Sequence, residues 1–270
     1  MRRFVLLTKS VGETPLASLE AYRAAHPEYA DLPMAYAGRL DPMASGKLLV
    51  LIGEECKRQE HYHGLDKEYV FEVLFGISSD TADVLGLLEG SLPTELTQKT
   101  VADAAREFTG EITLPYPHFS SKTVNGKPLH TWTLEGRIGE IQVPRKHSRI
   151  HCLEVQDVYE RTAAEIYEEA TRKIETIPLV TDPRKSLGND FRRAEIRSSW
   201  ESFKQSISPD ARFTIAKMRA ITSSGTYMRS LAEALGRQLG LPALAYSIDR
   251  TQIGRYLPLG RFHGIWLKRY

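Results

Sequence analysis

The most apolar run in the chain, KLLVLIG at residues 47–53, is short and ends at a glycine. Such a run is typical of a strand that is buried on both faces of a sheet. The loop before it, AGRLDP, places the carboxylate of Asp41 at the edge of this buried segment. A carboxylate at this position does not favour packing, because burying an unpaired charge is costly. The same position at the edge of the buried segment suits a reactive group.

The rest of the chain alternates between strand and helix patterns. Further strands are predicted at 4–8, 67–76 and 212–222. Helices are predicted over 54–65, 94–110 and 223–240. Another helix is predicted to begin after Thr14-Pro15, with Leu16, Leu19 and Tyr22 as its apolar face. A chain of 270 residues can form one large domain or two small ones. These patterns predict a mixed α/β (α+β) fold.

Charge and cysteine content narrow the possible functions. The formal net charge is +2, so any binding of nucleic acid must depend on local basic patches. The two cysteines, Cys56 and Cys152, lie in no CxxC pair and no His/Cys cluster, which predicts a cytoplasmic location without a disulfide framework or zinc site. The apolar run at the N-terminus is too short for a signal peptide, and no segment is long enough to span a membrane.

Residues 115–150 mix proline, glycine, aromatic and basic residues. Between Lys122 and Arg149 there are six Lys or Arg and two acidic residues. Two interpretations stay open for this segment. It is either a long surface hairpin, or a mobile basic arm that clamps a phosphate backbone while its aromatic residues stack on bases.

Residues 161–207 have the pattern of an insertion. The link in its middle contains Pro178, Pro183 and Gly188. Two amphipathic segments flank that link and predict a helical hairpin that packs on itself or on the main body. Their apolar positions are Ala163, Ile166, Ala170 and Ile174, then Ile196, Trp200, Phe203 and Ile207. The hairpin could contact RNA, but a solvated charged face is the interpretation we favour for Arg192, Arg193 and Arg197.

Arg229 is the second unusual charge. It lies in the first turn of the helix predicted at 223–240, off the apolar stripe of Met228, Leu231, Leu235 and Leu239. This end of a helix dipole is unfavourable for a cation, so we expect an anionic group close by. No GxSxG, P-loop or GxGxxG motif is present. The sequence therefore lacks the motifs that usually indicate a hydrolase, a kinase or a dinucleotide-binding protein.

Four segments together resemble the tRNA pseudouridine synthase B (TruB) family. They are AGRLDPMASGKLLVLIGEECK, DKEYVFEVLFG followed by SDTAD, FSSKTVNGKPLHTW followed by VPR, and ITSSGTYMRSLAEALGRQLG. The opening VLLTKSVGETPLASLEAYR is also similar to that family. The order and spacing of these motifs are more specific than any one motif alone. The resemblance covers residues 4–160 and 212–256.

The resemblance implies a pseudouridine synthase fold, with a central, mixed and mostly antiparallel sheet flanked by helices. It also implies isomerisation of a uridine in RNA to pseudouridine without cofactor or metal. Asp41 would be the catalytic residue, as a nucleophile on the sugar or in an elimination at C2′. Arg229 would pair with Asp41, orient it and keep it ionised. A purely structural ion pair is the alternative for these two residues.

The same resemblance implies how the substrate is held. The ring of Tyr69, in a K-x-Y motif with Lys67, would stack beneath the target base, and its hydroxyl would help to remove the C5 proton, so Tyr69 joins Asp41 and Arg229 as an expected catalytic residue. Its strand pattern alone would make Tyr69 an ordinary core aromatic. Ile248 would pack on the other side of the base, with Arg250 two residues further on. The base must first be flipped out of the RNA. Other expected substrate contacts are Tyr36, Arg39, Lys122, Lys127, Arg145 and Lys146.

The expected substrate is uridine 55 in the T loop of tRNA, recognised mainly by shape. Three features depart from the family pattern. Tyr36 stands where a histidine is usual, and the K-x-x-G register of the arm is shifted at Lys122, with Leu134 in place of a usual arginine. Because only 14 residues follow Tyr256, we expect no C-terminal PUA domain. We therefore expect residues 1–270 to form a single catalytic domain that acts as a monomer.

Two other functions stay open at this point. The same chemistry could act on another RNA, such as ribosomal RNA or a guide-directed target. Alternatively, the chain could be a tRNA-binding and folding module in which catalysis is secondary. An Asp41→Asn variant separates these possibilities, because a synthase would lose turnover while still binding RNA.

Overall fold

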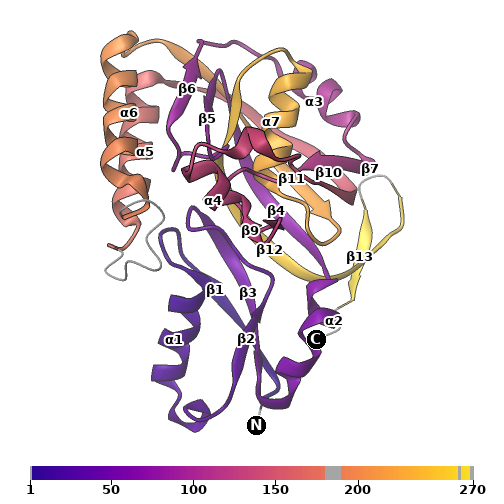
Figure 1. Cartoon of the computed structure of the whole chain (residues 1–270). Helices are drawn as coiled ribbons and strands as arrows, with labels where there is room; N and C mark the ends of the chain where they lie inside the picture. Colours follow the sequence, from indigo (N-terminus) through magenta and orange to yellow (C-terminus); the bar gives the residue numbers. More distant parts are fainter. Residues whose placement is uncertain (1, 180–189, 261–262, 268–270) are drawn as a thin grey trace.

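The structure, a computed structural model that describes residues 2–179, 190–260 and 263–267, is built around one large mixed sheet (Figure 1). Its strands follow the order β1 (Phe4–Lys9), β3 (Ala44–Ile52), β12 (Ala243–Pro258), β4 (Asp66–Phe75), β11 (Arg212–Thr222), β10 (Arg145–Thr162) and β7 (Gly110–Pro115). At its sides, β2 (Met34–Ala37) pairs with β3 and β13 (Gly264–Leu267) pairs with β12. In the described part of this sheet, β12 and β3 are the one parallel pair. The prediction of a central, mostly antiparallel sheet is confirmed.

Helices flank the sheet, as predicted. α1 (Pro15–Ala25) lies along β1 and β2, and α7 (Met228–Gln238) packs on β12 and β4 (Figure 1). α3 (Gln98–Arg106) packs on β10, and the short α2 (Gln59–His63) follows a 3-10 turn at Gly53–Arg58. Thr14 caps α1 by accepting a hydrogen bond from the amide of Ala17, which is the role that its position before Pro15 predicts.

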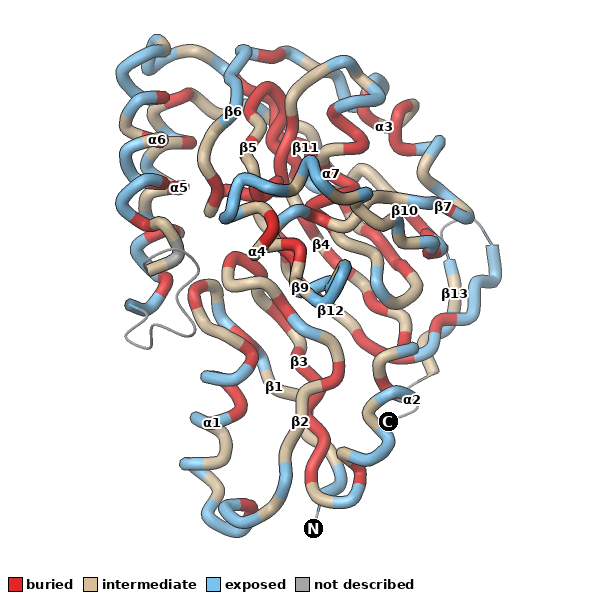
Figure 2. Tube along the Cα trace, in the orientation of Figure 1, coloured by how far each residue is buried: buried red, intermediate tan, exposed pale blue. Residues whose placement is uncertain are grey.

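The most apolar run forms β3, and it is buried on both faces as predicted (Figure 2). On one face Leu48 and Val50 pack against Leu19 of α1. On the other face Leu49 and Leu51 belong to a separate cluster with Tyr62 of α2. Leu16 does not belong to the buried face of α1, because it is 45% exposed; the helix covers the sheet mainly through Leu19.

The segment 115–150 forms less of an arm than expected. Its last residues, Arg145 to Ile150, pair with β7 and so belong to the main sheet. The part that leaves the sheet carries the small hairpin β8 (Thr123–Val124) and β9 (Lys127–Pro128), then α4 (Leu129–Leu134) and a 3-10 turn at Ile138–Glu140. Leu129 and Trp132 are the buried residues of α4. We refer to residues 116–144 as the arm.

The predicted helical hairpin is confirmed as α5 (Ala163–Thr176) and α6 (Arg193–Ser206), which lie side by side at one edge of the molecule (Figure 1). The predicted apolar positions are buried apart from Ile207, which is half-buried. The hairpin also packs on the main body, next to the small sheet of β5 (Ile77–Ser79) and β6 (Leu88–Ser91). Of the predicted link, Pro183 and Gly188 lie outside the described residues.

Candidate active site

Asp41 lies in the loop between β2 and β3, and Arg250 of β12 supports the backbone of that loop. The guanidinium of Arg250 donates hydrogen bonds to the carbonyl oxygens of Gly38 and Arg39 at 3.2 and 3.3 Å, and to that of Lys47 at 2.7 Å. Arg250 is 1% exposed. We expected Arg250 to contact the substrate. In the structure its guanidinium instead binds and holds the loop that carries Asp41.

Lys9 holds the other side of the same loop, and sequence reasoning did not single it out. Its ammonium lies at the end of β1 and donates to the carbonyl oxygens of Pro42 at 3.4 Å and Ala44 at 2.5 Å. Burial lowers the pKa of Lys9 to about 8, against the opposing effect of nearby carboxylates. Its only signal in the sequence is its place in the Lys-x-x-Gly turn that ends at Gly12.

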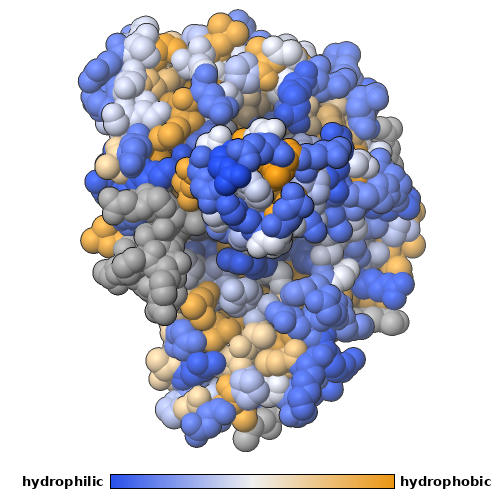
Figure 3. Space-filling view, viewed as in Figure 1, coloured by the Kyte–Doolittle hydropathy of each residue, from blue (hydrophilic) through white to orange (hydrophobic). Residues whose placement is uncertain are grey.

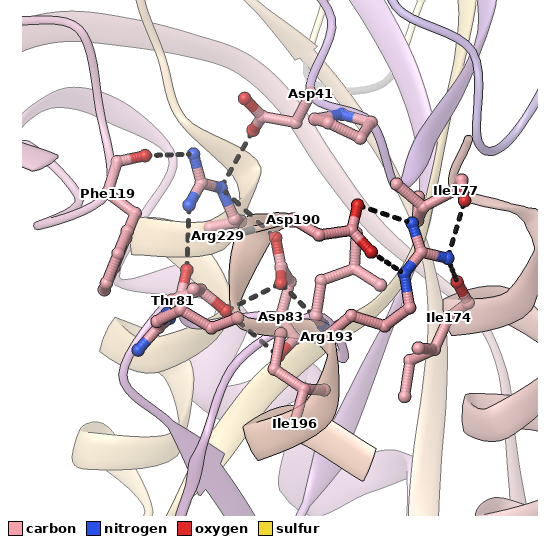
Figure 4. A pocket seen from close by; sticks show the side chains of 13 residues that line it. Asp41, Thr81, Asp83, Phe119, Ile174, Ile177, Asp190, Arg193, Ile196 and Arg229 are labelled. Atoms are coloured by element: carbon pink, nitrogen blue, oxygen red, sulfur yellow. Dashed lines mark hydrogen bonds and ion pairs between the residues drawn. The ribbon is translucent and has the colours of Figure 1, made fainter. Parts of the chain in front are cut away.

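Arg229 pairs with Asp41, as expected. Its Nε donates to Asp41 Oδ2 at 2.8 Å, while Nη1 and Nη2 donate to the carbonyl oxygens of Thr81 at 2.8 Å and Phe119 at 3.2 Å (Figure 4). The side chain of Arg229 is 4% exposed and that of Asp41 is 36% exposed. Burial lowers the pKa of Arg229 and the carboxylates of Asp41 and Asp83 raise it, with a net shift upward that keeps the guanidinium charged.

Asp83 is a second carboxylate beside Arg229, and from the sequence it was placed only within the segment SDTAD, without a role. Its Oδ2 lies 3.7 Å from Arg229 Nε, and its Oδ1 accepts hydrogen bonds from the Thr81 hydroxyl at 2.7 Å and the Leu85 amide at 2.9 Å. Asp83 is 4% exposed, and this burial raises the pKa of its carboxyl group. Arg229 therefore lies between one buried and one accessible carboxylate.

The expected base-stacking residues are buried. Tyr69 on β4 is 9% exposed and Ile248 on β12 is 6% exposed, and both belong to the main core. Lys67 is 4% exposed, and its ammonium donates to the carbonyl oxygens of His63 and Leu65. The structure brings these strand residues close to the Asp41 loop, because β12 pairs with both β3 and β4. Neither Tyr69 nor Ile248 presents more than a tenth of its surface to solvent.

The cavity beside Asp41 lies instead toward the helical hairpin. It has a volume of about 130 Å³, and Asp41 and Arg229 are among the residues that line it (Figure 4). Isoleucines of α5, of α6 and of the turn after α5 form the hairpin side, and Leu85 and Phe119 complete the apolar lining. The full set is Asp41, Pro42, Thr81, Asp83, Leu85, Phe119, Ile174, Ile177, Asp190, Arg192, Arg193, Ile196 and Arg229. Apolar walls with a few convergent polar groups are typical of a ligand site.

The arginines of the hairpin do not form the solvated face that we expected. Arg193 is 7% exposed and donates to the carbonyl oxygens of Ile174 and Ile177 at 3.3 and 2.7 Å, which closes the end of α5. Arg192 is also turned inward, toward Asp80 of the main body. Only Arg197 of the three matches the prediction, with a half-exposed side chain paired to Glu175.

The basic residues expected to contact RNA on the arm are engaged in local contacts. Lys127 lies 2.6 Å from a carboxylate oxygen of Glu135 and 4.5 Å from the ring centroid of Trp132. Lys122 lies 5.5 Å from the ring centroid of Tyr116. Hydrophilic side chains gather over the arm, and the surface is hollowed below it (Figure 3).

The other expected contact residues lie on separate elements of the fold. Arg145 is exposed and donates to the carbonyl oxygen of Thr113 at 2.6 Å, and Lys146 is half-buried against Gly225. Arg39 is exposed, with Nη1 at 3.5 Å from the hydroxyl of Ser121 on the arm. Tyr36 is half-buried, pairs with Val50 of β3 and packs with the cluster of Leu19, Leu48 and Val50.

The described residues provide neither a metal site nor a membrane-spanning helix. No group of three or more His, Cys, Asp or Glu is arranged there to hold a metal ion. No described helix has both the length and the apolar character needed to cross a bilayer.

Comparison with known proteins identifies the family. Residues 32–174, more than half of the chain, match the sequence model of the TruB family pseudouridylate synthase, N-terminal domain. The chain belongs to the TruB family. Curated relatives include the tRNA pseudouridine synthase B of Caldicellulosiruptor saccharolyticus, with 28% identity over 71% of this chain and 69% of the relative. The enzymes of the same name from Borreliella afzelii and Marinomonas sp. are 28% and 27% identical over 93% and 94% of this chain.

The chain spans 69% of the length of the Caldicellulosiruptor and Borreliella relatives and 64% of that of the Marinomonas relative. Among solved structures, a chain of a Cbf5–Nop10–Gar1 complex shares the fold, with a TM-score of 0.53 and 16% identity over 93% of this chain and 48% of that chain. The match to the TruB family model ends inside α5. α6, which supplies part of the cavity wall, therefore lies beyond the matched residues.

Proposed function

We propose that this protein isomerises a uridine of tRNA to pseudouridine and that Asp41 acts on the ribose of that uridine. The observation that carries the proposal is the state of the Asp41 carboxylate. Oδ2 is held by the buried Arg229, while Oδ1 accepts no hydrogen bond from the described residues and the side chain is 36% exposed. One oxygen is thus fixed and the other is accessible, as a nucleophile or base requires.

In the proposed reaction the bond between C1′ and N1 of the uridine breaks, the freed uracil rotates, and C5 bonds to C1′. C5 loses its proton and N1 gains one, so no atoms are added or lost. Asp41 either attacks the sugar or assists elimination at C2′, and both routes need an ionised carboxylate. Arg229, whose Nε lies 2.8 Å from Oδ2, places a fixed positive charge beside that carboxylate and sets its orientation.

For the substrate, we propose uridine 55 of the T loop, flipped out of the RNA to reach Asp41. Lys122, Arg145 and Lys146 would contact phosphates around the hollow below the arm, since lysine and arginine position nucleic acid through its backbone. Tyr69 and Ile248 are too buried to stack on a base in the present arrangement. We therefore propose that RNA displaces part of the arm, whose Phe119 contacts Arg229.

The test uses tRNA transcripts, either intact or with cytidine in place of the T-loop uridine. Wild type, Asp41→Asn and Asp210→Asn are incubated with each RNA, and pseudouridine is mapped by carbodiimide treatment and primer extension. Asp210 is an exposed aspartate outside the site and serves as the matched control. We expect one stop at position 55 with wild type and Asp210→Asn, and a loss of on the order of a thousandfold or more in turnover with Asp41→Asn.

Binding of the same RNAs completes the test, because Asp41→Asn should retain affinity close to that of wild type. A product with Asp41→Asn would remove Asp41 from its proposed role. Wild-type protein that modifies no tRNA would contradict the substrate, and ribosomal RNA would then be tested.

A further inference from the structure

We propose that Arg192, at the start of the second hairpin helix, is a positioning residue for the reaction. It holds the two backbone segments whose carbonyl groups bind Arg229, and Arg229 in turn holds Asp41. The inference rests on the proposed role of Asp41, and it gives the helical hairpin a part in the chemistry.

The first segment is the loop after β5. Arg192 Nη1 and Nη2 lie 2.6 and 3.3 Å from the two carboxylate oxygens of Asp80, a two-pronged ion pair with a fixed geometry. Asp80 is the residue before Thr81, whose carbonyl oxygen accepts from Arg229 Nη1 at 2.8 Å. The carboxylate of Asp80 also accepts from the Leu87 amide at 2.8 Å, so it is fixed from both sides.

The second segment is the arm. The guanidinium carbon of Arg192 lies 4.2 Å from the ring centroid of Phe119, within the range of a cation–π contact. The carbonyl oxygen of Phe119 accepts from Arg229 Nη2 at 3.2 Å. Phe119 and Thr81 are the residues whose carbonyl oxygens bind the guanidinium of Arg229. The guanidinium of Arg192 thus contacts Phe119 itself, and it contacts Asp80, the neighbour of Thr81.

The backbone of Arg192 supports this assignment. Its φ is 58°, a left-handed conformation that residues with a side chain rarely adopt and that persists where surrounding contacts impose it. The rest of α6 is anchored to the same part of the main body. Trp200 Nε1 donates to the carbonyl oxygen of Val84 at 3.1 Å, and the hydroxyl of Ser199 accepts from the amide of Leu88 at 2.9 Å. The hairpin therefore rests on the segment that carries Thr81.

A direct contact between Arg192 and an RNA phosphate is the competing explanation. The side chain of Arg192 is only 15% exposed, and its charge is already matched by the paired carboxylate of Asp80. Arg197 offers a matched control on the same helix. It also makes a two-pronged pair, through Nε and Nη2 to the carboxylate of Glu175 at 2.8 and 2.6 Å, but this pair lies within the hairpin.

The kinetic test compares Arg192→Ala, Arg192→Lys and Arg197→Ala on the tRNA that wild type modifies. For Arg192→Ala we expect kcat to fall roughly 10- to 100-fold, because small misplacements of reacting groups have effects of that size, with KM changed less than about twofold. Arg192→Lys should fall between wild type and alanine, since lysine keeps the charge but not the fork. Arg197→Ala should match wild type. A raised KM with unchanged kcat in Arg192→Ala, or equal effects at the two positions, would overturn the proposal.

A second measurement does not depend on activity. Hydrogen exchange at the Nε–H of Arg229, followed by ¹⁵N NMR, should be at least about tenfold faster in Arg192→Ala than in Arg197→Ala, because local opening exposes this group. If Arg192→Ala fails to fold, Arg192→Lys is measured in the same way and should exchange faster than Arg197→Ala. Equal exchange rates would overturn the positioning role. If wild type modifies no RNA, the proposed function fails while this measurement still decides the role of Arg192.

Discussion

Lys67 should give the stability of this protein a distinctive dependence on pH. Its side chain is 4% exposed, and its ammonium donates to the carbonyl oxygens of His63 and Leu65 and to the hydroxyl of Ser224. Burial, and next the positive charge of Arg250, lower the pKa of Lys67 to about 7. Deprotonation of the folded protein at this site therefore begins near neutral pH.

The direction of the effect follows from proton binding in the two states. The unfolded chain keeps the proton of Lys67 up to its ordinary pKa of 10.5, whereas the folded chain releases it near pH 7. Between these values the unfolded state binds more protons, so the free energy of unfolding rises with pH. Well below pH 7 both states are protonated and the contribution is constant. From pH 7 to pH 9 the two pKa values give a rise of about 2 kcal/mol.

The assay is urea unfolding at pH 7, 8 and 9 of wild type, Lys67→Met and Lys217→Met. Lys217 is exposed on β11 and serves as the control. Lys9, with a pKa of about 8, adds a smaller rise that all three proteins share. We expect the rise of Lys67→Met to be smaller than that of wild type and Lys217→Met by about 2 kcal/mol. An equally steep rise in Lys67→Met would refute the reasoning.

Substitutions at two further positions, Trp200 and Gly46, test the packing around the site. Trp200→Phe should lower the free energy of unfolding by about 1 kcal/mol, because it leaves the buried carbonyl of Val84 without its donor. Trp200→Ala should lower it by about 3–5 kcal/mol, because it also leaves a cavity in the core. Both losses are measured by urea unfolding. Gly46→Ala should cost more than about 2 kcal/mol, because φ is +104° and the new Cβ would lie 2.4 Å from the carbonyl oxygen of Arg250. Gly139→Ala, with open space around it, is the control; equal losses at both glycines would contradict the prediction.

The sequence patterns were sufficient for most of the fold because each depends on local chemistry. The run at 47–53 could only be buried on both faces, and Thr14 before Pro15 marked the start of α1. The pairing of Asp41 with Arg229 was also predictable, since each charge lay where it needed a partner and the family motifs connected them. The roles of these residues in catalysis remain proposals.

The remaining parts of the site depend on contacts between distant segments. Nothing local to Lys9 or Arg250 indicates that both point at the backbone of one loop, because that follows from β1 and β12 lying on either side of β3. The periodicity of α6 predicted a helix but not its docking, so Arg192 was expected on a solvated face. The hairpin residues that line the cavity are brought there by the same docking, so the sequence did not indicate the cavity either.

The charges around Arg229 are difficult to explain by stability alone. Two carboxylates, Asp41 and Asp83, surround one buried guanidinium, and burial raises the pKa of Asp83. Replacing buried ion pairs by apolar residues of similar volume is often neutral, or stabilising by roughly 1–4 kcal/mol. A fold selected for stability alone would have no need of Arg229 here. The arrangement is explained if the buried Asp83 fixes Arg229, and Arg229 fixes one oxygen of Asp41 while the other stays accessible to an RNA ribose.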